Sequence, residues 1–263
     1  MLVERFESAL WETSSLLLAA GSEAVLIDPG VAADEVARIA ARVRELDVRI
    51  THVLATHADW DHVCGIAAFP VAAATMSEAT AARLAARAED ATVAERAAAS
   101  GIDIAGEPRV DRTFAAGAAL QLGPFLVETL ALPGHTPDGT AFRVRELDVL
   151  AVGDHLSTVE FPFVTSTAAY RGTLAALIDL LRRDPPARVV PGHGPELTAA
   201  EALPVAEADL GYLWELHDAV TAGATQDEAR AAGLAVDVPR PAAEDLAEAH
   251  AANVEAALSE RFG

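Results

Sequence analysis

The sequence predicts a four-layer α/β (α+β) fold, in which two β-sheets pack face to face and helices cover their outer faces. Segments with strand character come in two batches, within residues 1–55 and 110–190, and segments with helical periodicity follow each batch. Apolar residues make up 52% of the 263 residues, enough to fill a large core. We therefore expect a single domain, with an αββα core over residues 1–197 and a helical C-terminal subdomain over 198–263.

The first batch of strands lies in the N-terminal part of the chain. Its short apolar segments are Leu2–Leu10, Ser14–Ala19, Glu23–Asp28 and Ile50–Ala55. The third segment ends in the turn sequence Asp-Pro-Gly at residues 28–30. Residues 32–46 place apolar side chains at every third or fourth position between charged ones, which predicts an amphipathic helix packed on the sheet.

The rest of the chain repeats this alternation. Residues 77–100 are Ala-rich and open with Ser77 as a candidate N-cap, which predicts a helical segment over the sheet. The second batch of strands is expected at Val110–Phe114, Ala119–Leu122, Phe125–Leu130, Thr140–Val144, Val149–Val152 and Arg188–Val190. Helices are expected over residues 167–183, 198–222 and 243–261, with a Pro-Arg-Pro sequence at 239–241 before the last one.

The charge balance and the cysteine content limit the functions that are open to this chain. Forty acidic residues against 19 basic ones give a formal net charge of −21, so nucleic acid and anionic membranes are not expected partners. The N-terminal residues contain no apolar run long enough for a signal peptide or a bilayer span, which predicts a cytoplasmic location. The single cysteine, Cys64, excludes a multi-cysteine zinc cluster, so any metal site must use histidine and carboxylate.

The most informative segment is Thr-His-Ala-Asp-Trp-Asp-His at residues 56–62, which follows a buried strand. In extended backbone, alternate side chains lie on the same side, so His57, Asp59 and Asp61 can converge. A turn into the following helix would bring His62 beside them. Four potential ligands within six residues suit two adjacent metal ions.

Three further segments place a ligand type directly after a predicted strand. They are Leu-Pro-Gly-His ending at His135, Val-Gly-Asp ending at Asp154, and Val-Pro-Gly-His ending at His193. Any one of these sequences alone is typical of a polar loop or a turn. Their joint occurrence, at strand ends that share one sheet edge, predicts a metal centre.

Together these segments resemble the metallo-β-lactamase superfamily, whose pattern is H-x-H-x-D-H, then a glycine-preceded His, an Asp and a final His. The resemblance runs from residue 57 to residue 193, and the strands that end at Asp28 fit the same fold. It implies an αββα sandwich of the metallo-β-lactamase type with C-terminal helices. It also implies a metal-dependent hydrolase that uses a metal-bridged hydroxide on a small ester, thioester or lactone. A small-molecule substrate is therefore the expected partner.

The resemblance further implies which side chains bind the two metals. His57, Asp59 and His135 would bind one ion, Asp61, His62 and His193 the other, and Asp154 would bridge both. Asp61 would also orient the hydroxide and so act as the catalytic carboxylate. Two divalent ions are expected, with zinc as the first expectation. Iron and manganese stay open, because histidine and carboxylate ligands suit all three metals.

Asp59 stands where the family has its second histidine. The carboxylate either ligates, or the first site has lost a ligand and a single ion binds; an outer-shell acid is the remaining interpretation. We expect ligation, because aspartate is a competent ligand at a position that should point into the site.

A redox function is the alternative. Flavodiiron proteins resemble the same fold and hold two irons with H-x-E-x-D-H, but the 70 residues after His193 lack the hydroxyl-rich phosphate loop of their flavodoxin domain. Persulfide dioxygenases, a second redox relative, bind one iron through the residues that correspond to His57, His135 and Asp154, all present here. A non-haem iron redox enzyme, persulfide dioxygenase-like or di-iron, therefore stays open.

Five other residues have side chains capable of chemistry, but their sequence surroundings favour a structural role. His155 and the helix-start Cys64 are interpreted as structural, and Asp138 as a turn residue. His250 and Asn253 share a helix whose default role is core packing, with a weaker claim to substrate contacts.

Overall fold

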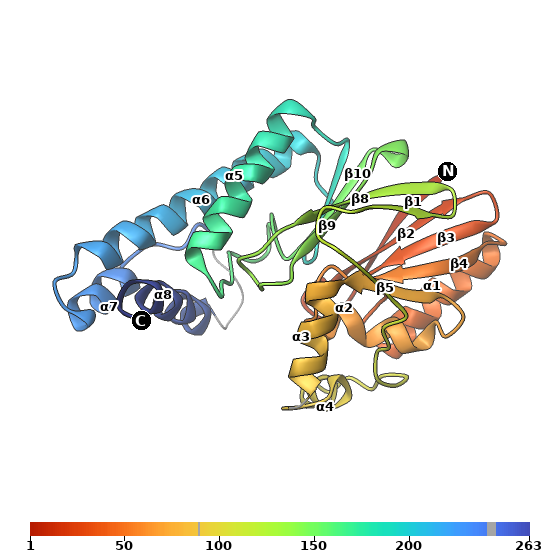
Figure 1. Cartoon of the computed structure of the whole chain (residues 1–263), viewed down its shortest axis with the longest axis horizontal. Helices are drawn as coiled ribbons and strands as arrows, with labels where there is room; N and C mark the ends of the chain where they lie inside the picture. Colours follow the sequence, from red (N-terminus) through yellow and green to blue (C-terminus); the bar gives the residue numbers. More distant parts are fainter. Residues whose placement is uncertain (89, 241–245) are drawn as a thin grey trace.

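The computed structural model describes residues 1–88, 90–240 and 246–263, and its strands form two mixed sheets (Figure 1). The first sheet has the strand order β1-β2-β3-β4-β5-β6: β1 (Leu2–Glu7), β2 (Ser14–Ala20), β3 (Glu23–Ile27), β4 (Arg49–Leu54), β5 (Ala73–Ser77) and β6 (Arg112–Phe114). The second sheet has the order β11-β10-β9-β8-β7: β7 (Ala119–Leu122), β8 (Phe125–Ala131), β9 (Thr140–Val144), β10 (Val149–Gly153) and β11 (Arg188–Pro191).

The helices fall between and after these strands. They are α1 (Ala33–Glu45), α2 (Trp60–Val63), α3 (Glu78–Ala88), α4 (Val93–Ala99), α5 (Thr167–Arg183), α6 (Ala199–Ala222), α7 (Gln226–Leu234) and α8 (Leu246–Phe262), with short 3-10 turns η1 (Cys64–Ala68) and η2 (Arg145–Leu147).

Three apolar cores separate four layers of structure. Because side chains alternate along a strand, Leu16 of β2 packs with Phe125 and Phe142 between the two sheets, while its neighbour Leu17 packs toward Ile39 of α1. On the other outer face, residues of β10 and β11 share a core with α5, α6 and α8. The αββα sandwich predicted from the sequence is therefore confirmed.

The strand ends that carry the candidate ligands meet at one edge of this sandwich. β10 and β11 are parallel neighbours, and the Gly192 amide donates to the Gly153 carbonyl at 2.6 Å. The end of β4 reaches the second sheet, since the Thr140 amide donates to the Thr56 carbonyl at 2.9 Å. Hydrogen bonds thus join the segments that begin at residues 153 and 192 to each other, and the segment that begins at residue 56 to the second sheet. All three segments lie at the same edge of the sandwich.

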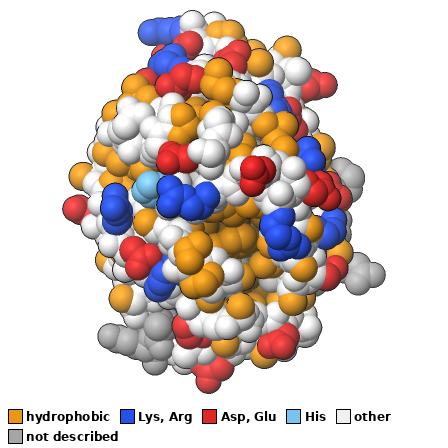
Figure 2. Space-filling view, turned by 90° about the vertical axis from the view of Figure 1, so that its right-hand side faces the viewer, with side chains coloured by type: hydrophobic (Ala, Val, Ile, Leu, Met, Phe, Trp, Pro, Cys, Tyr) orange, Lys and Arg blue, Asp and Glu red, His pale blue; other side chains and the backbone are white. Residues whose placement is uncertain are grey.

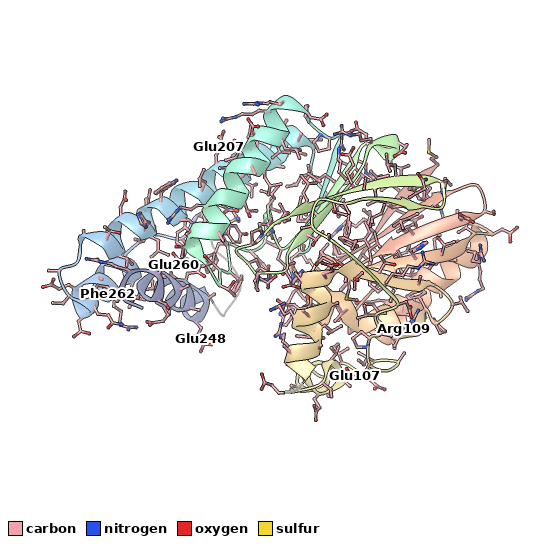
Figure 3. The ribbon with its side chains drawn as sticks, viewed as in Figure 1. Glu107, Arg109, Glu207, Glu248, Glu260 and Phe262 are labelled. Carbon is pink, nitrogen blue, oxygen red and sulfur yellow. The ribbon has the colours of Figure 1, made fainter. Side chains whose placement is uncertain are left out.

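The C-terminal helices extend away from the second sheet on the side of α5 (Figure 1). Glu260 of α8 lies beside the first turn of α5 (Figure 3), where its carboxylate accepts hydrogen bonds from Ser166 Oγ at 2.7 Å and from the Ala168 amide at 3.2 Å. A carboxylate at a helix N-terminus satisfies free amides and complements the helix dipole. This contact ties the last helix to the start of α5.

Three details differ from the elements predicted above. Strand β5 was not predicted, because its sequence of small residues shows no alternation. The predicted helical segment over residues 77–100 is two helices, and the second begins at a capping box formed by Thr92 and Glu95. Helix α7 was missed as well. Of the expected helix 243–261, residues 243–245 lie outside the described part, as does Pro241.

Arginine side chains are scattered among acidic ones on the face shown in Figure 2 and form no continuous stripe there, while hydrophobic side chains gather near its centre. Within the described ranges, no helix is both long enough and apolar enough to cross a bilayer.

Candidate metal centre

The structure brings all seven predicted ligand side chains together at the shared edge of the two sheets. Three sets of donor atoms each lie within 4.8 Å of one another: His57, Asp59 and His135; Asp61, His62 and His193; and His57, His62 and Asp154. The first two sets are the two ligand trios that the resemblance implied. As ligands, the seven residues stay a prediction.

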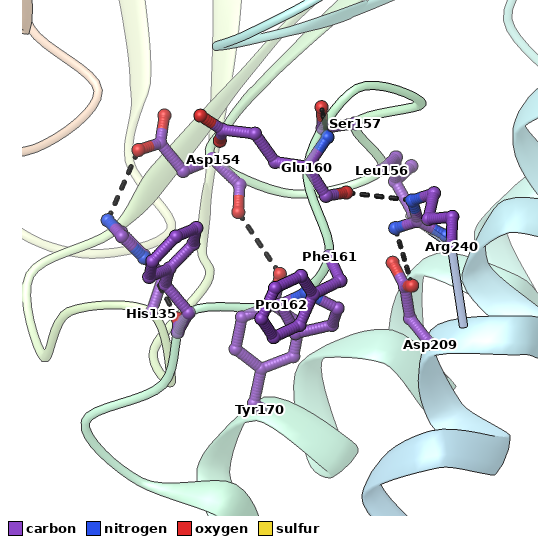
Figure 4. Close-up of a pocket in the computed structure, with 11 residues that line it drawn as sticks. His135, Asp154, Leu156, Ser157, Glu160, Phe161, Pro162, Tyr170, Asp209 and Arg240 are labelled. Atoms are coloured by element: carbon purple, nitrogen blue, oxygen red, sulfur yellow. Dashed lines mark hydrogen bonds and ion pairs between the residues drawn. The ribbon is translucent and has the colours of Figure 1, made fainter. Parts of the chain in front are cut away.

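Asp154 lies between the two trios. Its Oδ1 is 3.1 Å from His62 Nε2, and its Oδ2 is 3.2 Å from His135 Nε2 and 3.3 Å from His193 Nε2. Figure 4 shows this carboxylate beside the His135 ring, and the Tyr170 hydroxyl donating to the Asp154 carbonyl. A carboxylate with both oxygens directed at imidazoles of the two trios is suited to bridge two ions.

Each of the four imidazoles is oriented through its Nδ1 atom. The acceptors are Thr56 Oγ1 for His57 at 3.0 Å, Asp28 Oδ2 for His62 at 2.9 Å, the Phe163 carbonyl for His135 at 2.9 Å and the Trp11 carbonyl for His193 at 3.0 Å. The Thr56 hydroxyl donates its own proton to Asp28, so it accepts from His57. With Nδ1 engaged as the donor, Nε2 of each ring is left to face the centre, as in metal sites with hydrogen-bonded outer partners.

Asp28 supports the candidate centre, although its place in the sequence indicates only the end of a strand. Its Oδ1 accepts from the Thr56 amide at 2.8 Å and its Oδ2 contacts both Thr56 and His62. The available signal was topological: β3 and β4 are parallel neighbours, so an acid at the end of β3 lies beside the start of the ligand segment. Its positive φ of 48° marks the sharp turn that places it there.

Burial and the contacts between histidines and carboxylates shift the pKa values at this centre in opposite directions. Burial lowers the pKa of a histidine, yet contact with Asp154 and other carboxylates raises the pKa of His135 to about 10 and that of His193 to about 9. Burial raises the pKa of Asp59, but the His135 and His57 imidazoles hold it well below its ordinary value. The buried carboxylates are therefore stabilised by positive charge close to them, which protonated histidines or divalent cations can supply.

A pair of divalent ions fits these donors. The Nε2 atom of His57 is buried and has no hydrogen-bond partner among the described residues. Buried polar atoms are rarely left unpaired, and this one faces Asp59 and Asp154 at 3.5 Å, a spacing that leaves each of them free to ligate a shared ion. Imidazole and carboxylate together suit zinc, iron or manganese.

A pocket of about 600 Å³ opens onto the centre at Asp59, Asp61, Asp154 and His193. Its walls are mostly apolar: Trp11, Trp60, Val159, Phe161 and Phe163. The Trp11 and Trp60 rings meet edge to face with centroids 5.7 Å apart, and the Phe161 and Phe163 rings stack at 5.5 Å. Trp11 and Phe163 keep 50% and 38% of their surfaces exposed, so the pocket offers uncovered aromatic surface beside the ligands.

His250 and Asn253 support the wall of this pocket without lining it. The Asn253 side chain donates to the Pro162 carbonyl at 2.6 Å and accepts from the Val164 amide at 3.0 Å. It also donates to the Tyr212 hydroxyl, whose oxygen lies 2.9 Å from His250 Nδ1. These contacts fix the segment that carries Phe161 and Phe163, so the weaker claim of the two residues to direct substrate contact is not supported.

His155 and Cys64 take the structural roles expected of them. His155 stacks on Tyr170 with ring centroids 4.6 Å apart, and burial lowers its pKa to about 3, which keeps the ring neutral. Burial raises the pKa of the Cys64 thiol to about 12, so the buried thiol stays protonated at neutral pH.

The chain is similar to known metallo-hydrolases, in agreement with a metal centre at these residues. The family model described as "Metallo-beta-lactamase superfamily" matches residues 9–193. The chain is 25% identical to the probable metallo-hydrolase YqgX of Bacillus subtilis over 193 residues, which cover 70% of this chain and 86% of that protein. It is 30% identical to a hydroxyacylglutathione hydrolase of Cereibacter sphaeroides over 138 residues, 52% of this chain and 45% of that protein.

Among solved structures, the metallo-beta-lactamase family protein TTHA1429 from Thermus thermophilus has the same fold. The TM-score is 0.66 at 18% identity, over 97% of this chain and 91% of that chain. The family model covers well over half of the chain and includes every predicted ligand. The chain therefore belongs to the metallo-beta-lactamase superfamily and is a metallo-hydrolase of that superfamily.

Proposed function

We propose that this hydrolase cleaves a small, uncharged ester, thioester or lactone whose apolar group occupies the aromatic pocket. The pocket itself supports the proposal, since four aromatic side chains stand directly beside the candidate ligands. Among the described residues that line it, Arg87 is the only arginine, and its guanidinium pairs with Asp59. Glu12 and Glu160 add acidic groups. Glu12 and Glu160 would repel an anionic carrier such as glutathione, and the one arginine among the described lining residues is already paired with Asp59.

The residues around the centre can divide the work of hydrolysis. Divalent ions held by this donor set would acidify a water to a pKa of about 7 and polarise the substrate carbonyl. Asp61 is buried at the pocket floor, with its Oδ2 3.3 Å from His62 Nε2 and 3.4 Å from the Thr13 hydroxyl. We assign it the role of orienting the attacking water and accepting its proton. The aromatic walls would exclude bulk water and hold the apolar group of the substrate.

A redox enzyme is the second candidate function, and the composition of the ligand trios favours it. Each trio combines two imidazoles with one carboxylate, which is the donor set that non-haem iron prefers. Oxygen consumption by the iron-loaded protein with glutathione persulfide is the reaction that would reveal it.

The test of the hydrolase is a comparison of neutral and anionic substrates. We expect the metal-loaded protein to hydrolyse δ-decalactone and the phenylacetyl thioester of N-acetylcysteamine, and to act far more slowly on S-lactoylglutathione. A chelator should abolish the activity, and added zinc, iron or manganese should restore it. Metal-loaded protein that hydrolyses neither neutral substrate, but consumes oxygen with glutathione persulfide, would favour the redox enzyme.

Two tryptophans of equal exposure provide a matched pair of variants. Trp11 lines the pocket and Trp214 lies on α6, with 50% and 49% of their surfaces exposed. We expect Trp11→Ala to raise KM for the thioester roughly tenfold, because lost aromatic contact costs about 1–2 kcal/mol. Trp214→Ala should leave KM unchanged. Equal effects of the two changes would contradict the placement of the apolar group in this pocket.

A further inference from the structure

The carboxylate of Asp59 is shared between the metal centre and two arginines. Its Oδ2 faces the centre, 3.2 Å from His135 Nε2 and 3.5 Å from His57 Nε2. Its Oδ1 faces the opposite way, where Arg83 donates at 2.8 Å and Arg87 donates a second hydrogen bond. The two arginines are four residues apart on α3, so they project from the same face of the helix.

Arg83 also joins the two loops that carry the first ligand trio. Its second guanidinium nitrogen lies 3.2 Å from Asp138 Oδ1, and the other oxygen of Asp138 accepts from the Ala58 amide at 2.8 Å. The Asp138 side chain is 1% exposed. The turn residue of the His135 loop is therefore an anchor for the loop of His57 and Asp59, with Arg83 as the link.

We infer that Arg83 and Arg87 are positioning residues that make Asp59 a metal ligand through one oxygen and offset its charge. This inference rests on the proposed metal centre. Histidine, which the family places at this position, is neutral and offers a single donor atom to an ion. Aspartate adds one negative charge and a second oxygen, and the arginine pair engages that oxygen and supplies positive charge within contact distance.

The arrangement also explains why two arginines are present and not one. Arg83 divides its guanidinium between Asp59 and Asp138, so its charge is already shared by two carboxylates. Arg87 pairs with Asp59 alone among the described residues. The two positive charges of the arginines therefore balance the two negative charges of Asp59 and Asp138. Asp59 together with its arginines adds no net charge to the centre, as a neutral histidine at this position would add none.

The test measures zinc affinity in two backgrounds. We expect Arg87→Gln to weaken binding of one of the two zinc ions about 10–100-fold, as removal of outer-shell partners usually does, when zinc is titrated against a chromophoric chelator. Arg87→Lys should recover part of the affinity, because an ammonium can still donate to Asp59 Oδ1 but lacks the planar fork that fixes its orientation. In an Asp59→His background, where no carboxylate needs positioning, Arg87→Gln should leave zinc affinity unchanged.

A matched control separates this role from a general loss of stability. Arg182→Gln breaks an exposed arginine–carboxylate pair with Glu207 between α5 and α6. Neither residue lines the pocket at the centre, so the change should not alter zinc affinity. Equal losses from Arg87→Gln in the parent protein and in the Asp59→His background would show a structural role and overturn the inference. So would unchanged zinc affinity in Arg87→Gln. Hydrolysis of the neutral thioester is followed on the same samples, so unchanged affinity with intact hydrolysis refutes the inference and leaves the proposed function standing.

Discussion

Asp154→Asn should remove at least one of the two metal ions and lower kcat/KM by more than about 100-fold, since loss of an outer-shell partner alone costs about 10–100-fold. The Asp154 carboxylate lies within 3.5 Å of the Nε2 atoms of all four imidazoles at the centre, those of His57, His62, His135 and His193. An amide keeps its shape but supplies no charge and cannot bridge two cations through both of its ends. Metal content by elemental analysis and steady-state kinetics measure the two effects.

The control for this variant is a second buried aspartate nearby. Asp209 is 1% exposed and pairs with Arg240 at 2.6 Å, and both line the same small cavity as Asp154 (Figure 4). Asp209→Asn should cost stability, because it removes the carboxylate that pairs with the partly buried Arg240, but should keep both metals. If Asp154→Asn retains two tightly bound ions, the bridging role is wrong.

Gly192→Ala should disrupt the metal centre through steric overlap. A Cβ at this position would lie 2.1 Å from Asp154 Oδ1 and 3.0 Å from His62 Cε1. The backbone cannot shift easily, because the Gly192 amide donates to Gly153 and its carbonyl accepts from Ser14. Asp154 must therefore rotate away. We expect a loss of stability of about 1–3 kcal/mol by denaturant unfolding, together with loss of metal.

The matched control is Gly172→Ala in α5, where an added Cβ meets nothing within 4 Å. That change should stabilise the protein by up to about 1 kcal/mol, because alanine favours the helix, and should leave metal content unchanged. Full metal occupancy in Gly192→Ala would mean that the site tolerates a displaced Asp154, contrary to the bridging geometry.

Most of the sandwich was predictable because its strands are apolar and bounded by turn residues. Helix 167–183 and strands such as Thr140–Val144 were predicted with the boundaries observed. Strand β5 and helix α7 were not, because neither has the apolar periodicity that distinguishes a strand from a helix. Their identity depends on neighbours: β5 is a strand because β4 and β6 pair with it on both sides.

The candidate ligands could be predicted because each follows a strand, whereas their supporting contacts could not. Asp28 is 34 residues from His62, and Arg83 is 24 residues from Asp59. The sequence shows that these residues are charged but not that they meet. Backbone acceptors such as the Trp11 and Phe163 carbonyls have no sequence signature at all.

The most direct test of the dinuclear centre is a crystal structure of zinc-loaded protein with anomalous diffraction at the zinc edge. We predict two anomalous peaks with ligand distances of about 2.0–2.2 Å. One ion should be bound by His57, Asp59 and His135, the other by Asp61, His62 and His193, with Asp154 between them. A single peak, or an Asp59 carboxylate whose two oxygens both face away from the zinc, would contradict this assignment.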